Sequence, residues 1–269
     1  MAKKYSKVIT IAGSDSGGGA GIQADLKTFA ALGCYGMSVI TALTAQNTKG
    51  ITAIHAIPTP FVIAQLEALF EDIGAEAVKI GMLHSGEMVE TVAEQLKKHR
   101  AKNIVLDPVM AAQSGESLSS DKAIDAMKKH LFPLVTVLTP NLPEAALLLN
   151  REISNLEDMQ QAAHDLAAYG TGSVLLKGGH LKGDDTTDVL YIGPEDRSVV
   201  LPGERIKTRN NHGTGCTLSS ALASFLAKDF ALEEASRSAK EYLMGTIQAG
   251  AEYKIGQGNG PPHHFFKHW

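Results

Sequence analysis

Short apolar runs rich in β-branched residues alternate along this chain with stretches in which apolar residues recur at helical spacing. The apolar runs span residues 8–12, 38–42, 77–80, 103–106, 135–138 and 173–176. Between them, the helical stretches include residues 61–70, 88–96 and 159–166. This alternation predicts a three-layer α/β/α sandwich, in which helices cover both faces of a mainly parallel central sheet.

Two places depart from the alternation. Residues 51–57 alternate apolar and polar side chains less cleanly, which indicates a peripheral strand. Residues 188–192 and 198–201 flank Gly193-Pro194 and predict an antiparallel hairpin at an edge of the sheet. The 269 residues are 44% hydrophobic and contain no linker-like segment, so we expect one domain over residues 1–269.

Composition excludes several classes of partner. The net charge is −4 and no basic stripe is present, so we expect no nucleic-acid binding. The first apolar run is too short to span a bilayer, and we expect no membrane association. Cys34 and Cys216 form no disulfide framework or zinc spacing, which favours a cytoplasmic protein.

Polar or glycine-rich segments follow four of the predicted strands. In open α/β sheets, ligands bind beyond the carboxyl ends of the strands, so these segments should meet at one site. They are Gly13-Ser-Asp15, Asp107-Pro108, Pro140-Asn141 and Lys177-Gly-Gly179.

The segment Asn211-His-Gly-Thr-Gly-Cys-Thr217 leads into a predicted helix. Gly213 and Gly215 let the backbone turn N–H groups toward one point, and the helix adds its positive dipole end, so we expect an anion site. A plain loop before a helix is the alternative. Cys216 lies where a thiol pKa tends to fall. It is a candidate general base, although an inert core residue or a covalent nucleophile is also open.

A second cluster, residues 13–21, holds five glycines in nine residues, and a helix follows near Ala20. Such a segment approaches a ligand closely or adopts positive φ angles. It matches neither GxxxxGK[ST] nor GxGxxG, which argues against a P-loop or a dinucleotide fold. A substrate pocket closed by this turn explains more than a merely flexible loop.

Asp107 and Glu144 are candidate Mg²⁺ ligands, since this ion takes one or two protein carboxylates together with phosphates and water. Alternatively, Glu144 only stabilises a helix, because a negative charge in the first turn interacts favourably with the helix dipole. Lys177 can reach a nucleotide phosphate, or it can be a solvated lysine. The adjacent His263 and His264 are a poor chelate, so the C-terminal segment is interpreted as a docked or mobile tail.

The motifs taken together resemble the bacterial hydroxymethylpyrimidine kinase/phosphomethylpyrimidine kinase family of the ribokinase-like superfamily, from about residue 8 to the tail. Single motifs are weak, whereas the ordered set is specific. In chain order they are Ala12-Gly-Ser-Asp-Ser-Gly-Gly-Gly-Ala-Gly-Ile-Gln-Ala-Asp-Leu-Lys-Thr28, Thr44-Ala-Gln-Asn-Thr48, Lys79-Ile-Gly-Met-Leu83, Leu106-Asp-Pro-Val-Met110, Thr139-Pro-Asn-Leu-Pro-Glu-Ala145, Leu176-Lys-Gly-Gly-His180 and His212-Gly-Thr-Gly-Cys-Thr217.

The resemblance implies a ribokinase-like fold, a homodimer, and transfer of phosphate from ATP with Mg²⁺. The acceptor would be 4-amino-5-hydroxymethyl-2-methylpyrimidine and then its monophosphate, in thiamin biosynthesis. By resemblance, the pyrimidine contacts are Gly13, Asp25, Gln46 and Met82. The anion hole is Gly213, Thr214 and Gly215, with Cys216 as proposed base. Asp107 and Glu144 belong to the Mg-phosphate region, and Lys177 and Asn141 to the nucleotide site.

Other functions stay open at this point. Sugar kinases of the superfamily usually carry Asp where this chain has Cys216, which argues against a ribose-type substrate. A pyridoxal kinase on the same scaffold is the nearest alternative, although the amide of Gln46 favours a ring nitrogen beside an exocyclic amine. A non-catalytic pyrimidine sensor and a Rossmann oxidoreductase are more distant alternatives.

Overall fold

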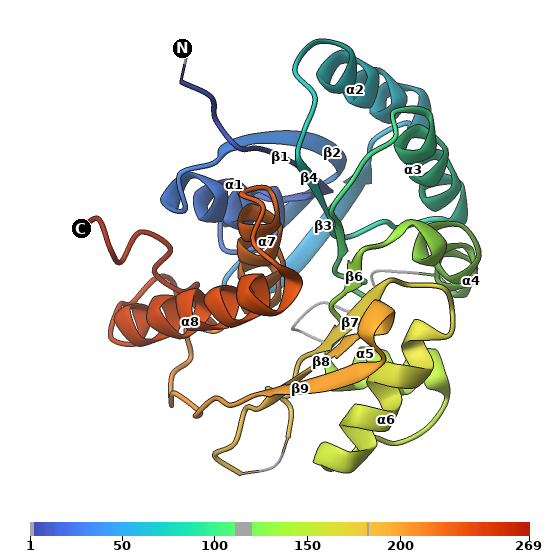
Figure 1. Ribbon diagram of the computed structural model, residues 1–269. Helices are drawn as coiled ribbons and strands as arrows, with labels where there is room; N and C mark the ends of the chain where they lie inside the picture. Colours follow the sequence, from blue (N-terminus) through green and yellow to red (C-terminus); the bar gives the residue numbers. More distant parts are fainter. Residues whose placement is uncertain (1–2, 111–119, 182) are drawn as a thin grey trace.

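The computed structural model describes residues 3–110, 120–181 and 183–269 (Figure 1). Within these residues, nine strands form one sheet. The strands are β1 (Lys7–Asp15), β2 (Tyr35–Asn47), β3 (Gly50–Ala56), β4 (Ala77–Ile80), β5 (Ile104–Leu106), β6 (Val137–Leu138), β7 (Ser173–Leu176), β8 (Asp188–Ile192) and β9 (Arg197–Leu201).

Helices connect most of the strands. They are α1 (Gly21–Ala31), α2 (Thr59–Asp72), α3 (Gly86–Lys98), α4 (Asp121–Ala126), α5 (Leu142–Leu149), α6 (Leu156–Ala167), α7 (Thr214–Leu226) and α8 (Leu232–Gly250). A π-helical turn, η1 (Met127–Leu131), and a 3-10 turn, η2 (Phe132–Leu134), follow α4, and a 3-10 turn, η3 (Gly193–Glu195), joins β8 to β9.

The strand order is β3-β2-β1-β4-β5-β6-β7-β8-β9. The central strands from β2 to β7 pair in parallel, and β3, β8 and β9 pair antiparallel at the two edges. The predicted mainly parallel sheet is therefore confirmed, together with the peripheral strand near residues 51–57 and the edge hairpin after Asp188.

The alternation of side chains along the strands divides the core into two layers. In β5, Ile104 and Leu106 pack with α2 to α6, whereas Val105 between them packs with α1, α7 and α8. Neighbouring strands repeat the pattern because successive side chains of a strand point to opposite faces. Figure 1 shows α7 and α8, in orange and red, on the side of the sheet opposite α2 and α3. The predicted α/β/α sandwich is thus confirmed.

The helices share one property of composition. Among those in the described part of the chain, none combines the length and the apolar composition that a bilayer span requires. α8 has 19 residues, and five of its first ten are charged.

Candidate active site

The carboxyl ends of β1, β4, β5 and β7 open into one cavity of about 710 Å³. The parallel strands of the sheet bring their ends to the same edge, as the sequence predicted. The predicted site residues that line the cavity are Gly13, Gln46, Met82, Asp107, Asn141, Glu144, Lys177, Gly213, Thr214, Gly215 and Cys216.

Asp25 is the exception. Its side chain on α1 is completely buried below the cavity, and its oxygens accept hydrogen bonds from Thr10 at 2.6 Å, Ser220 at 2.7 Å and Lys79 at 2.9 Å. Its lone pairs are directed to these three protein donors. The structure thus places Asp25 beneath the cavity rather than in its lining, as an anchor for Lys79, so a contact of Asp25 with the pyrimidine stays a prediction.

Lys79 is a site residue that our sequence reasoning missed. It is also fully buried, yet it lines the cavity floor beside Gly81. The available signal was its position inside a four-residue buried strand, Ala77-Val-Lys-Ile80, because a lysine is almost never buried unless it is paired.

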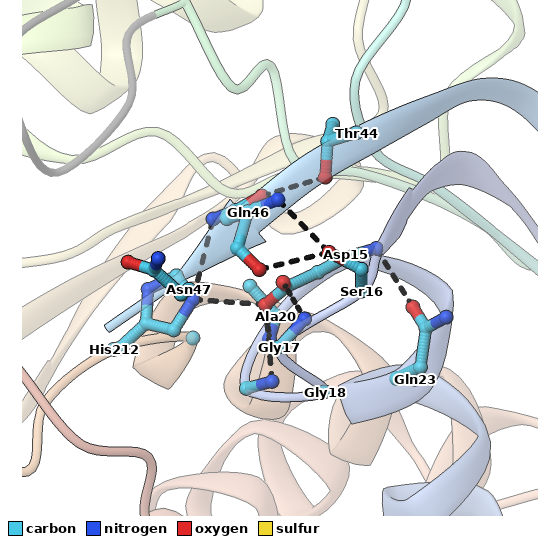
Figure 2. Close-up of polar contacts among 12 residues, drawn as sticks. Asp15, Ser16, Gly17, Gly18, Ala20, Gln23, Thr44, Gln46, Asn47 and His212 are labelled. Carbon is cyan, nitrogen blue, oxygen red and sulfur yellow. Dashed lines mark hydrogen bonds and ion pairs between the residues drawn. The ribbon is translucent and has the colours of Figure 1, made fainter. Parts of the chain in front are cut away.

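The glycine-rich turn after β1 is organised by Asp15, a second residue that was missed (Figure 2). The carboxylate of Asp15 accepts backbone N–H bonds from Gly17 at 2.7 Å, Gly19 at 3.0 Å and Ala20 at 2.8 Å. It also lies 2.9 Å from Nε2 of His212, in the loop before α7. One carboxylate therefore joins the two predicted loops into a continuous wall.

Replacing Asp15 with asparagine is expected to destabilise the protein in a pH-dependent way. Burial would raise the pKa of the Asp15 carboxyl, but the bonds from His212, Ala20 and Gly17 hold it below its usual value. The ionised form therefore stabilises the fold above about pH 4, and this contribution is lost as the pH falls through the lowered pKa. Urea unfolding should show a deficit on the order of 1–3 kcal/mol at pH 7 that shrinks toward pH 3.5. A deficit independent of pH would contradict the assignment.

Gln46 and Met82 form the wall opposite α7. Figure 2 shows the Gln46 side chain beside the glycine-rich turn. Its Oε1 accepts a bond from Thr44 at 3.0 Å, and its Nε2 lies 3.4 Å from His212 Nε2. A Cβ atom on Gly13 would lie only 2.7 Å from the terminal methyl of Met82, so Met82 occupies space that Gly13 leaves free. This part of the cavity offers one amide and one apolar surface.

The segment that we predicted to form an anion hole lies at the start of α7. Gly213 is the N-cap residue in a left-handed conformation (φ 82°), and a side chain there would overlap the carbonyl of Gly19. The first helical hydrogen bond runs from Thr217 N to Gly213 O, so the N–H groups of Gly215 and Cys216 precede it. These donors and the helix dipole favour an anion at this point.

The expected lowering of the Cys216 pKa is wrong. Burial raises the pKa of this thiol to about 11, and the carboxylates of Asp25 and Asp107 act in the same direction. Lys79 and the N–H of Gly21 oppose the shift without overcoming it. The helix N-terminus was the only effect visible in the sequence, whereas the low-polarity surroundings depend on tertiary structure.

Lys177 and Asp107 lie next to the anion hole. Their side chains form an ion pair at 2.7 Å, and a Cβ on Gly215 would be 3.3 Å from Lys177 Nζ and 3.4 Å from an Asp107 oxygen. Glu144 lines the same part of the cavity, where burial raises its pKa, as does Asp107, against the opposing effect of Lys177. A cation and two carboxylates therefore meet at the N-terminus of α7.

Asn141 and Glu144 also cap α5. The Asn141 side chain accepts a bond from Glu144 N at 2.9 Å, and the Glu144 carboxylate accepts one from Asn141 N at 2.8 Å. This reciprocal pair is a capping box. The helix role that we considered as the alternative for Glu144 is thus present, and it holds the carboxylate at the cavity.

An apolar recess continues the cavity toward α8. Its lining includes Ile206, Leu243, Met244 and Ile247. On α8, Tyr242 is buried in the core, whereas Leu243 and Ile247 line the recess. The sequence did not reveal the recess. A helix that packs one face on the core and lines a ligand cavity with another shows the same spacing of apolar residues as an ordinary amphipathic helix.

Comparisons with known proteins identify the family of this chain. A family model described as phosphomethylpyrimidine kinase matches residues 15–263. A hydroxymethylpyrimidine/phosphomethylpyrimidine kinase of Rhizobium meliloti (strain 1021) is 52% identical over 262 residues, which cover 97% of each chain.

Two solved structures have the same fold. Phosphomethylpyrimidine kinase from Clostridium difficile 630 is 44% identical, with a TM-score of 0.80 over 90% of this chain and 99% of that one. Bacillus subtilis pyridoxal kinase, solved as an ADP complex, is 38% identical, with a TM-score of 0.89 over 97% of this chain and 98% of that one. By the extent of the family match and of the sequence identity, this chain belongs to the phosphomethylpyrimidine kinase family.

Proposed function

We propose that this protein transfers the terminal phosphoryl group of ATP to 4-amino-5-hydroxymethyl-2-methylpyrimidine, and that of a second ATP to the resulting monophosphate, in thiamin biosynthesis. The observation that carries the proposal is that one cavity holds both the Gln46 wall and the N-terminus of α7. The first suits the pyrimidine ring, and the second suits a phosphoryl group. The relative from Rhizobium meliloti bears the name of this double activity.

We propose that the Gln46 amide recognises the pyrimidine ring through hydrogen bonds. An aminopyrimidine presents a nitrogen acceptor beside an amine donor, and a side-chain amide can satisfy both. Met82 would contact the ring face beside Gly13. A site that reads a ligand through such hydrogen bonds rejects analogues that leave its polar groups unpaired.

The N-terminus of α7 and Lys177 are the proposed stabilisers of the phosphoryl group in transit. Phosphoryl transfer depends mainly on positioning and on charge stabilisation. The N–H groups of Gly215 and Cys216 are fixed by the helix, and Lys177 adds a full positive charge close to Gly215. Asn141 lines the cavity near Glu144 and would contact the nucleotide.

Asp107 and Glu144 fit a Mg²⁺ ion that arrives with the nucleotide. Both carboxylates line the cavity, and Mg²⁺ takes one or two protein carboxylates while phosphates and water complete its shell. In the described part of the chain, no three His, Cys, Asp or Glu side chains form a cluster suited to a metal. When bound, the ion would neutralise charge on the phosphates.

Cys216 is the proposed general base for the acceptor hydroxyl. Cys216 lines the same cavity as Gln46 and the Lys177–Asp107 pair, and it directly follows Gly215 at the start of α7. It would take the hydroxyl proton as the new oxygen–phosphorus bond forms. Lys79 and the Gly21 N–H are the groups that favour its thiolate form.

We also infer a homodimer formed through the β3 edge of the sheet. The last five residues of β3 are exposed, and Ile54 on this strand is 49% exposed. Open edge strands with apolar side chains are usually covered in native proteins. Sedimentation equilibrium at micromolar concentration should give twice the chain mass, and a monomer would contradict this inference.

A cytoplasmic location is inferred from the thiols. Cys34 and Cys216 are both free, and they lie on the buried face of the sheet and in the cavity. Free thiols are typical of a reducing compartment. Fractionation of cells should recover the protein with cytosolic markers.

The test of the proposed function is ADP formation from MgATP with three acceptors: hydroxymethylpyrimidine, its monophosphate and pyridoxal. We expect turnover with both pyrimidines. Turnover with pyridoxal alone would favour the second candidate, which the likeness to Bacillus subtilis pyridoxal kinase supports. Pyrimidine binding without ADP formation would favour a sensor. Gln46→Glu is a matched variant that should lose the pyrimidine reactions, because it replaces the amide donor with a negatively charged acceptor.

A further inference from the structure

The C-terminal segment, residues 256–269, is docked on the loops of the active site. The N–H groups of Gly258 and Asn259 donate to Oγ1 and O of Thr48, in the β2–β3 turn, at 3.1 and 2.9 Å. Further along, His212 N donates to Gly260 O at 3.0 Å. Of the two states considered for the tail, the structure has the docked one.

His264 is the buried side chain of this segment that faces the anion hole. It is only 4% exposed, and its Nε2 lies 3.0 Å from Oγ1 of Thr217, which is fully buried. The Thr217 hydroxyl donates its one hydrogen to Gly213 O at 2.9 Å. With this hydrogen directed to Gly213 O, the Thr217 oxygen accepts from His264, and on that basis we assign the imidazole proton to Nε2.

The charge state of His264 agrees with this role. Burial lowers the pKa of its imidazole to about 4, and nearby Lys27 and His263 act in the same direction. The ring is thus neutral at physiological pH, with one N–H to donate. Its backbone is held separately, since the Tyr242 hydroxyl donates to His264 O at 2.7 Å.

The acceptor at the end of this chain of bonds is the carbonyl of the N-cap residue. Gly213 O receives both the backbone N–H and the hydroxyl of Thr217, each at 2.9 Å. A peptide unit is planar, so fixing this carbonyl also fixes the Thr214 N–H of the same unit, which donates to Asn211 O at 3.4 Å. The orientation of the first turn of α7, with the N–H groups of Gly215 and Cys216, follows from that plane.

We propose that His264 is a positioning residue for phosphoryl transfer, which acts through the Thr217 hydroxyl to hold the Gly213–Thr214 peptide plane at the anion hole. The inference rests on the proposed function, because it assumes that this hole receives the transferring group. Small errors in the direction of preorganised donors reduce rate, since these donors stabilise charge that develops only in the transition state.

The test compares His264→Leu and Thr217→Val with their conservative partners, His264→Gln and Thr217→Ser. The first pair breaks the chain of hydrogen bonds from His264 through Thr217 to Gly213 O. The second pair keeps an N–H or a hydroxyl at the same place. We expect each of the first pair to lower kcat about 10- to 100-fold, the range typical for outer partners of a site, with KM for the pyrimidine within about twofold of wild type. His264→Gln and Thr217→Ser should recover most of the rate.

The double variant His264→Leu/Thr217→Val and the control Tyr242→Phe complete the design. The double variant should be no slower than the slower single variant, because both changes break one chain of bonds. Tyr242→Phe removes the neighbouring bond to the His264 carbonyl, so it should lower the melting temperature and leave kcat unchanged.

Three outcomes would overturn the inference: wild-type kcat in Thr217→Val, multiplicative losses in the double variant, or a loss in Tyr242→Phe equal to that in His264→Leu. Thr217→Val and Thr217→Ser carry the test if His264→Leu does not fold. Activity of the wild-type protein on each acceptor distinguishes a failure of this inference from a failure of the proposed function. If it acts on pyridoxal alone, the same variants are measured on pyridoxal, and if it transfers phosphate to neither acceptor, both ideas fail.

Discussion

Replacing Cys216 with alanine is expected to lower kcat for the pyrimidine acceptor by about 10²- to 10⁴-fold, the contribution typical of a general base. The thiol would be lost, while the N–H groups at the start of α7, Lys177 and the apolar recess remain. KM for ATP should therefore change by less than about threefold. Steady-state ADP formation at saturating acceptor measures both values, and Cys216→Ser should lose as much because a hydroxyl is a poorer base.

The pH profile of the wild-type enzyme checks the same assignment. With the pKa of the thiol raised to about 11, the reactive thiolate is a small fraction at neutral pH, and that fraction grows about tenfold per pH unit below the pKa. The logarithm of kcat should rise with a slope near one from about pH 6.5 to 8.5. A flat profile together with near-normal turnover in Cys216→Ala would show that the thiol only lines the site.

Replacing Lys79 with methionine is expected to lower the free energy of unfolding by about 3–5 kcal/mol, the usual cost of leaving one member of a buried ion pair alone. Burial by itself would lower the pKa of Lys79, but the adjacent Asp25 raises it well above its usual range, so the ammonium is charged in the fold. Without Lys79, the Asp25 carboxylate keeps only the hydroxyl donors of Thr10 and Ser220. Urea denaturation measures the loss.

Two further variants separate this effect from a general loss of charge. Lys79→Met/Asp25→Asn removes both charges and should be more stable than Lys79→Met alone. Lys98→Met breaks the exposed Lys98–Glu67 pair, whose atoms are only 2.6 Å apart, and should leave the urea midpoint nearly unchanged. Equal losses in Lys98→Met and Lys79→Met would contradict the role of burial.

The sequence predicted correctly those parts of the fold in which burial makes apolar side chains recur at a regular spacing. β4 and β7 were predicted with the bounds that they have, because both are covered by helices on two faces. The strand predicted over residues 38–42 is the middle of β2, which extends to Asn47. Beyond Ala42 the strand is partly exposed and pairs with the exposed β3, so no apolar pattern marks it.

The residues of the candidate site likewise divide into those that the sequence predicted and those that depend on contacts distant in sequence. Asp107 and Lys177 were predicted because they directly follow strands, and parallel strands bring such residues together. Asp25 lies on a helix, and sequence alone does not reveal that Lys79 and Ser220 take up its oxygens. The raised pKa of Cys216 was equally inaccessible, since it results from groups that are distant in sequence.

The docked tail has a consequence for the order in which the protein folds. Gly258 and Thr48 are 210 positions apart, yet they share a hydrogen bond in the β2–β3 turn. Contacts of such separation are opposed by the entropy of closing a long loop. We therefore expect the β2–β3 turn and the loop before α7 to become ordered only after the sheet that carries them has formed, because both take hydrogen bonds from this distant segment.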